Sequence, residues 1–210
     1  MVQALAKPVT FAEFLEWKSD EKRYELHNGV IIEMNQPLGK HERIGGFLTR
    51  KLSVEFDRLN LPYFIPKQAL VKSPGGELGE SAYSPDILIL NDDNLVNESL
   101  WEKQSTVTQG DSIPLVIEIV STNWRVDYLT KAADYEEIGI LEYWIVDYLA
   151  LGGRRFIGNP KQPTISVYSF VEGEYQVSQF RGDERIVSPI FPDLNLSAEQ
   201  IFNAGKLIQI

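Results

Sequence analysis

The alternation of apolar and polar residues along the chain predicts several short strands. Strands are predicted where an apolar run is bounded by polar or turn-forming residues, at 63–72, 86–90, 114–120 and 141–147. Two β-hairpins are predicted near the chain ends, at 22–34 around Asn28-Gly29 and at 164–180 around Glu172-Gly173. Residues 73–85 are expected to form a loop, and residues 91–113 a helical turn plus a loop.

Helices are predicted where apolar residues recur every three or four positions. The segment 41–59 has this spacing from Ile44 to Phe56, although Gly45-Gly46 weakens its helix propensity. A second helix is predicted over 121–139, with Gly139 at its C-terminal end. Two short helices are expected after the capping-box pairs Thr10 with Glu13 and Ser197 with Gln200.

The order of these elements predicts a mixed α/β (α+β) fold. Residues 115–146 read as strand, helix and strand, a crossover long enough for the two strands to pair in parallel. The hairpins contribute antiparallel parts. We therefore expect a single domain over 1–210, in which a central mixed sheet is flanked by helices and extra antiparallel hairpins lie at the ends.

Composition narrows the class of protein. The 210 residues include no cysteine, which excludes disulfides and thiolate metal sites. No apolar run is long enough to span a membrane, and MVQALAKPVT does not resemble a leader peptide, so we expect a cytoplasmic protein without a membrane partner. The 20 basic and 30 acidic residues give a net charge of −10. This charge argues against a general nucleic-acid binder but leaves room for a local basic patch.

Two acids next to buried strands are candidates for chemistry. Glu118 lies within the apolar run VIEIV, and Asp86 directly precedes ILIL. A buried carboxylate without a partner is costly, so Glu118 must be protonated, pair with a cation such as Lys131, or bind a metal ion together with Asp86. Oxygen ligands of this kind would suit Mg²⁺ or Mn²⁺.

These segments resemble a known family. SPDILIL, PLVIEIVS, RVDYLTKAADYEEIGILEYWIVD and the N-terminal TFAEFLEW…YELHNGVIIEM are similar to the Uma-type bacterial endonucleases of the PD-(D/E)XK, restriction-endonuclease-like superfamily. The resemblance covers about residues 8–205. It divides the chain into an N-terminal helix and hairpin (8–34), a core (41–147) and a C-terminal hairpin and helix (164–205). It implies a restriction-endonuclease-like core and a divalent-metal site.

The resemblance also assigns roles to individual residues. Asp86, preceded by Pro85, matches the first acid of the superfamily pattern, and Glu118 matches the second. The pattern places a lysine two positions after the second acid, where this chain has Val120. In this family the lysine has moved to the following helix, where Lys131 is the match. A helix that begins near Trp124 would allow this lysine to reach back to Glu118.

Further site residues are implied by the same resemblance. Glu25 and His41 match residues of the family, although they can also be read as an exposed hairpin residue and a helix-capping residue. The backbone carbonyl of Ile119 is implied as an additional metal ligand. Asp127 resembles a recurrent acid, but its spacing of four from Lys131 equally fits a helix ion pair. The four tryptophans are interpreted as core or packing residues.

Three functional hypotheses follow. The first is a Mg²⁺-dependent endonuclease that hydrolyses DNA, binds it weakly and forms a homodimer, with Asp86 and Glu118 holding the metal and Lys131 acting on the nucleophile or the developing charge. The second is a non-catalytic protein that retains the fold and acts through self-association or partner binding. The third is a nuclease that depends on a partner chain or on a structured substrate.

Overall fold

The computed structural model describes residues 7–19, 22–76 and 78–206. Most of the N-terminal segment in which no leader pattern was recognised, residues 1–6, lies outside the described residues. Within the described residues, no helix has both the length and the apolar character needed to cross a membrane.

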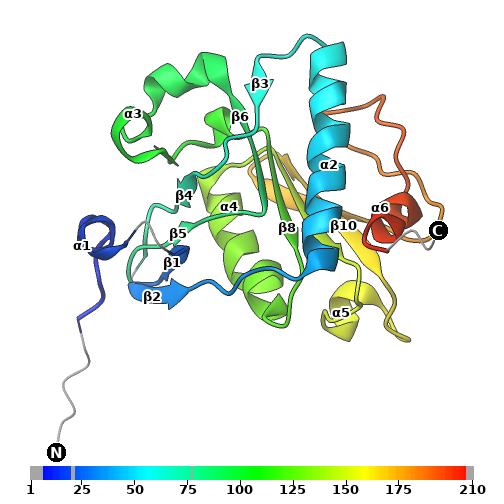
Figure 1. The fold of residues 1–210 in the computed structure, drawn as a ribbon, viewed down its shortest axis with the longest axis horizontal. Helices are drawn as coiled ribbons and strands as arrows, with labels where there is room; N and C mark the ends of the chain where they lie inside the picture. The colour runs from blue at the N-terminus through cyan, green and yellow to red at the C-terminus, as the bar shows by residue number, and fades with distance from the viewer. Residues whose placement is uncertain (1–6, 20–21, 77, 207–210) are drawn as a thin grey trace, which may run out of the picture.

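A six-stranded mixed sheet forms the centre of the protein (Figure 1). Its strands in spatial order are β11 (Glu174–Phe180), β10 (Thr164–Val171), β9 (Glu142–Asp147), β8 (Leu115–Ile119), β6 (Ile87–Asn91) and β3 (Tyr63–Phe64). Strands β8 and β9 are parallel, and the other neighbouring pairs are antiparallel. The predicted C-terminal hairpin therefore extends the central sheet.

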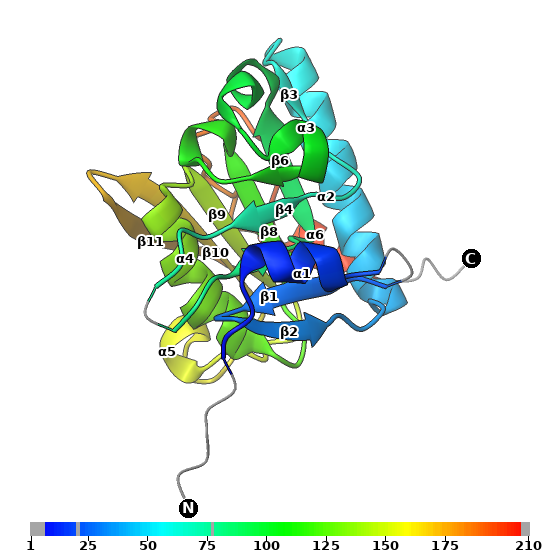
Figure 2. The ribbon, with the colours of Figure 1, turned by 90° about the vertical axis from the view of Figure 1, so that its left-hand side faces the viewer.

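A second sheet lies beside the first and contains the N-terminal hairpin. Its strands in spatial order are β2 (Val30–Glu33), β1 (Tyr24–His27), β5 (Ala82–Tyr83), β4 (Leu70–Lys72) and β7 (Thr106–Val107). Helix α1 (Phe11–Trp17) covers this sheet, as Figure 2 shows. The helix buries Phe11 and Phe14 against Leu26 and Leu70.

Helices cover both faces of the central sheet because the apolar residues of β8 alternate between the two faces. Leu115, Ile117 and Ile119 pack toward α2 (Gly39–Arg58) and α6 (Ala198–Ala204). Val116 and Val120 pack toward the helix that follows β8. That helix begins as the π-helical segment η3 (Val126–Lys131) and continues as α4 (Ala132–Ile138). The remaining short helices are η1 (Asp92–Asn97), α3 (Trp101–Gln104), η2 (Gly110–Ser112) and α5 (Arg154–Ile157).

The local sequence signals are confirmed. Both predicted hairpin turns have positive φ at their two central residues, as a type I′ turn requires: Asn28 (48°) and Gly29 (74°), Glu172 (52°) and Gly173 (96°). Both predicted capping boxes are formed, and Gly139 ends α4 with a φ of 81°. The predicted mixed α/β class with a central sheet flanked by helices is confirmed.

Three sequence interpretations are wrong in detail. The range 63–72 is not one strand, because it divides into β3 in the central sheet and β4 in the second sheet. Pro66, which cannot donate a ladder hydrogen bond, lies between the two. The expected loop regions 73–85 and 91–113 contain the short strands β5 and β7, respectively. Trp17 is not a packing residue of the core, since 56% of its surface is exposed.

Candidate functional site

A buried ion pair answers the question that Glu118 raises. Glu118 on β8 and Lys131 at the end of η3 are 4% and 3% exposed, and Lys131 Nζ lies 2.8 Å from Glu118 Oε1. The Tyr135 hydroxyl donates a second hydrogen bond to the same oxygen, at 3.1 Å. The chain therefore satisfies the buried carboxylate with a cation and a hydroxyl, which is one of the three solutions considered above.

Glu25 brings the second sheet into this cluster. Its Oε1 lies 3.1 Å from Lys131 Nζ and accepts a hydrogen bond from the Ser84 backbone N–H at 2.9 Å. Its Oε2 lies 2.7 Å from His27 Nε2. Glu25 is 1% exposed, so the interpretation of it as an exposed hairpin residue is wrong. Lys131 thus joins one acid from each sheet.

Asp86 lies level with Glu118 on the neighbouring strand. The antiparallel register pairs Ile87 with Ile117, and one further step places Asp86 opposite Glu118. Asp86 Oδ2 accepts a hydrogen bond from the Ile119 N–H at 2.8 Å. His41 Nε2 lies 3.1 Å from Asp86 Oδ2 and 3.1 Å from the Ile119 carbonyl oxygen. The Asp86 carboxylate oxygen and the Ile119 carbonyl oxygen therefore both face His41 Nε2.

A fourth acid, Asp127, is buried in the same region. It is 9% exposed and lies on η3, where the wide π-helical turn gives Asp127, Tyr128 and Lys131 buried positions. Such turns are frequently found at functional sites. The helix ion pair suggested by its spacing is not formed, because in the described residues Lys131 pairs with Glu118 and Glu25 instead.

The pKa values of Glu118 and Asp127 are raised, partly because several acids lie close together. Burial raises the pKa of Glu118 well above its ordinary value; Lys131 opposes this shift, and the nearby Asp86, Asp127 and Glu25 add to it. Burial likewise raises the pKa of Asp127 to about 7, against the attraction of Lys131. Four carboxylates thus face one ammonium group, so a further positive charge would be stabilised here.

The pKa values of Glu25 and Lys131 are both shifted toward the charged form. Burial alone would raise the pKa of Glu25, but Lys131, His27 and the Ser84 N–H outweigh it and lower the pKa to about 2. Burial alone would lower the pKa of Lys131, but Glu118 and Glu25 raise it well above its ordinary value. Both groups are therefore ionised at neutral pH.

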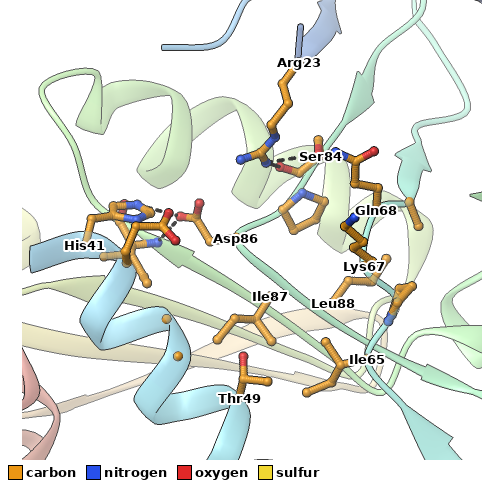
Figure 3. A pocket seen from close by; sticks show the side chains of 17 residues that line it. Arg23, His41, Thr49, Ile65, Lys67, Gln68, Ser84, Asp86, Ile87 and Leu88 are labelled. Carbon is orange, nitrogen blue, oxygen red and sulfur yellow. Dashed lines mark hydrogen bonds and ion pairs between the residues drawn. The ribbon is translucent and has the colours of Figure 1, made fainter. Parts of the chain in front are cut away.

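A pocket of about 270 Å³ opens beside Asp86 (Figure 3). His41, Asp86 and Ile119 line it, together with Arg23 and Lys67. In Figure 3 Asp86 and His41 point toward one another, and Arg23 reaches to Ser84. The Arg23 Nη2 donates to the carbonyl oxygen and the hydroxyl of Ser84, at 3.3 and 3.2 Å. Solvent thus reaches Asp86 and His41, whereas Glu118, Glu25 and Asp127 stay buried behind them.

Glycines on α2 leave room for this pocket. Gly45 and Gly46 lie inside the helix and line the pocket, so the pair does not mark the helix start. A Cβ atom on Gly45 would lie 3.6 Å from the Ile119 side chain, whereas one on Gly46 would meet nothing within 4 Å. The contact at Gly45 would be an ordinary van der Waals distance, so no close approach to β8 requires either glycine.

The donor set suits a hard divalent cation in part. Asp86, Glu118 and the Ile119 carbonyl offer oxygen ligands, and the surplus of carboxylates supplies the negative charge that Mg²⁺ or Mn²⁺ requires. In the described part of the chain, no three Asp, Glu or His side chains form a ready-made metal site. A metal here would depend on the backbone carbonyl, water or substrate oxygens, as is usual for Mg²⁺.

The residues singled out from the sequence are therefore neighbours. Lys131 joins Glu118 and Glu25, while Asp86 and His41 meet at Ile119. Four further residues of the site were not expected from the sequence: His27, Ser84, Tyr135 and Arg23. Two signals could have found some of them: Arg23 and His27 alternate with Glu25 along a strand, and Tyr135 follows Lys131 by one helical turn.

The family model described as "Uma2: Putative restriction endonuclease" matches residues 11–199. The chain belongs to the Uma2 family. Among solved structures, one similar chain is the crystal structure of a "putative nuclease belonging to DUF820" from Anabaena variabilis ATCC 29413, with a TM-score of 0.69 and 20% sequence identity. The similarity covers 95% of this chain and 100% of that one. No curated protein matches the chain. The resemblance to Uma-type endonucleases, and the fold it implied, are confirmed.

Proposed function

We propose that this Uma2 chain is a Mg²⁺- or Mn²⁺-dependent endonuclease that hydrolyses DNA phosphodiester bonds. The observation that carries the proposal is the acid cluster beside the Asp86 pocket. Asp86, Glu118 and the Ile119 carbonyl would hold the metal. When bound, a divalent ion at such a site polarises the scissile phosphate and lowers the pKa of water.

Lys131 and His41 have different proposed roles in the reaction. Lys131 is almost fully buried, and the lining of the Asp86 pocket does not include it. Its supported role is therefore to favour the ionised form of Glu118 against burial and to orient its carboxylate, as a positioning residue, while direct action on the nucleophile stays a prediction from the resemblance. His41 lines the pocket, and its Nε2 can hold or release a proton beside Asp86. Burial lowers the pKa of His41, but Asp86 and the Ile119 carbonyl outweigh this and raise it.

One observation favours a non-catalytic protein instead. The Glu118–Lys131 pair is complete without a metal, and a buried pair of this kind can be purely structural. In that case the chain would act through self-association or partner binding, and Asp86 would be replaceable without loss of function. The homodimer is part of either proposal and is checked by light scattering of the purified protein.

A plasmid-nicking assay separates the two proposals. Wild type, Asp86→Asn, Glu118→Gln and the exposed control Glu102→Gln are incubated with supercoiled and single-stranded DNA in Mg²⁺, Mn²⁺ or EDTA. The endonuclease proposal expects cleavage only with metal, at least about 100-fold slower in the two site variants and unchanged in the control. Absence of cleavage with either metal, or equal cleavage by all four proteins, would favour the non-catalytic protein.

A further inference from the structure

A larger hollow adjoins the Asp86 pocket. It has a volume of about 660 Å³ and lies between the end of α1, the start of β1 and the end of α3. We call it the basic hollow, because Lys18, Lys22, Arg23 and Lys103 line it. Its other polar lining residues are uncharged: Ser19, Tyr24, Gln68, Ser84, Gln104 and Ser105.

The charge of the basic hollow is opposite to that of the whole chain. The net charge is −10, yet no carboxylate contributes to the described lining of this hollow. In the sequence Asp20 and Glu21 stand between Lys18 and Lys22, outside the described residues. Lys22 forms an ion pair with Glu33 at 2.7 Å, but both side chains are more than half exposed. Such a pair contributes little, so Lys22 can exchange Glu33 for another anion.

The basic hollow adjoins the Asp86 pocket. Arg23, Gln68, Ala69 and Ser84 line both spaces. Arg23 stands at the junction, where two hydrogen bonds from Nη2 to Ser84 fix its guanidinium group. An extended anion can therefore pass from the lysines, across Arg23, to Asp86.

An exposed aromatic residue lies at the edge of the basic hollow. Trp17 is 56% exposed and directly precedes Lys18. Its ring packs edge-on against Tyr24, which lines the hollow, with 4.9 Å between the ring centroids. A fixed, exposed indole beside several cations is the combination by which proteins bind unpaired nucleic acids, because bases stack on the ring while cations follow the phosphates.

We propose that the basic hollow binds an unpaired DNA strand and leads one of its phosphates to Asp86. The inference rests on the proposed function, since it extends the substrate site beyond the Asp86 pocket. The cations Lys18, Lys22, Arg23 and Lys103 contact phosphates, and Trp17 stacks on a base. Base faces are hidden in a duplex, so the hollow selects single-stranded over double-stranded DNA.

Binding is measured by fluorescence anisotropy of a labelled oligonucleotide in EDTA, where no metal-dependent cleavage occurs. The probes are a single strand and the same strand in a duplex, over a range of salt concentrations. The variants are Trp17→Ala, Trp17→Phe and the pair Lys18→Gln with Lys103→Gln. The matched control is Lys161→Gln with Lys206→Gln, two exposed lysines outside both lining sets.

The proposal expects weaker single-strand binding in the hollow variants and no change in the control. Trp17→Ala should lose about five- to one-hundred-fold in affinity, and Trp17→Phe should restore most of it. The Lys18 and Lys103 pair should reduce the salt slope, d log K/d log[salt], by about 1.4, because two phosphate contacts are lost. Equal affinity and slope in the lysine pair and the wild type, or equally tight duplex binding, would overturn the proposal.

Asp86→Asn keeps this test separate from the proposed function. It should bind the strand at least as tightly as wild type, because it removes a negative charge beside the path. If hollow variants bind like wild type, this inference fails and the cleavage proposal is untouched. If the wild type binds through the hollow but cleaves nothing with any metal, the proposed function fails and the binding surface stands.

Discussion

Replacing Lys131 with methionine tests how the acid cluster is held. Methionine keeps an unbranched apolar stem of similar length, so Lys131→Met removes the charge without leaving a large cavity. Glu118 and Glu25, at 2.8 and 3.1 Å from the ammonium group, would both lose their buried counter-charge. We expect a large loss of folding stability.

The magnitude follows from the geometry. Two unit charges about 3 Å apart attract by about 5 kcal/mol at an effective dielectric constant of about 20. Much of this attraction is offset, because the variant no longer pays for burying the ammonium group. Removing one partner of a buried pair typically leaves a net cost of about 3–5 kcal/mol. This is a large fraction of the total stability of a domain of this size.

The cost should grow with pH. In the folded protein the pKa of Glu118 lies above its ordinary 4.5, so between these two values the folded state binds more protons and stability falls as pH rises. Lys131 limits this loss. It also helps to hold the pKa of Glu25 at about 2, a gain in stability that is present above pH 4.5. Without Lys131 the pKa of Glu118 would be raised further, and the pKa of Glu25 would be lowered less. The variant should therefore lose more stability at pH 8 than at pH 5.

Urea unfolding at pH 5 and pH 8 in EDTA measures these differences. Lys40→Met, at an exposed position, is the matched control and should change the free energy of unfolding by less than about 0.5 kcal/mol. The double variant Lys131→Met with Glu118→Gln should recover part of the loss, because an uncompensated acid is removed. A loss below about 1 kcal/mol for Lys131→Met, or a loss independent of pH, would refute this account of the cluster.

Three further predictions test other parts of the structure. Millimolar Mg²⁺ or Mn²⁺ should raise the thermal midpoint of wild type in calorimetry, because a metal at 100 times its Kd adds about 2.7 kcal/mol to the free energy of unfolding. The midpoint of Asp86→Asn should not shift. Asp127→Asn should stabilise the protein increasingly from pH 4 to pH 7, by at most about 4 kcal/mol, since the folded Asp127, whose pKa is raised to about 7, holds a proton that the unfolded chain releases over this range; urea titrations in EDTA that show no such trend would count against it. Gly46→Ala should raise the free energy of unfolding by about 0.5–1 kcal/mol, because an added Cβ meets nothing within 4 Å. Gly110→Ala should sharply lower the melting temperature, because its Cβ would lie 2.2 Å from the Gly139 oxygen. A melting temperature that is higher for Gly110→Ala than for Gly46→Ala would be inconsistent with this packing.

The elements and the central acids could be predicted because their signals are local. Glu118 is conspicuous as an acid inside an apolar strand, and Asp86 as an acid at a strand start. The capping boxes and the Asn28-Gly29 turn depend on residues within a few positions of one another. The family resemblance, together with a helix predicted to begin near Trp124, placed Lys131 where it could reach Glu118.

The remaining features depend on contacts between distant segments. Two of the three partners of Glu25 are distant in sequence, because Ser84 follows β5 and Lys131 ends η3, and the hairpin sequence alone gives no indication that Glu25 is buried. The π-helical turn at 126–131 was not predicted, because the apolar spacing of so short a segment does not distinguish a wide turn from an ordinary one. Trp17 was interpreted as a core or packing residue from its residue type alone, but α1 buries its other face and Trp17 is mostly exposed.

The central claim is that Asp86, Glu118 and the Ile119 carbonyl form a divalent-metal site. Anomalous diffraction from crystals grown with saturating Mn²⁺ tests this claim most directly. The account predicts a strong anomalous peak at coordination distance from the Asp86 carboxylate and the Ile119 carbonyl oxygen, absent from crystals of Asp86→Asn. A Mn²⁺-saturated crystal with no peak there, in which His41 still bridges these two oxygens, would contradict it.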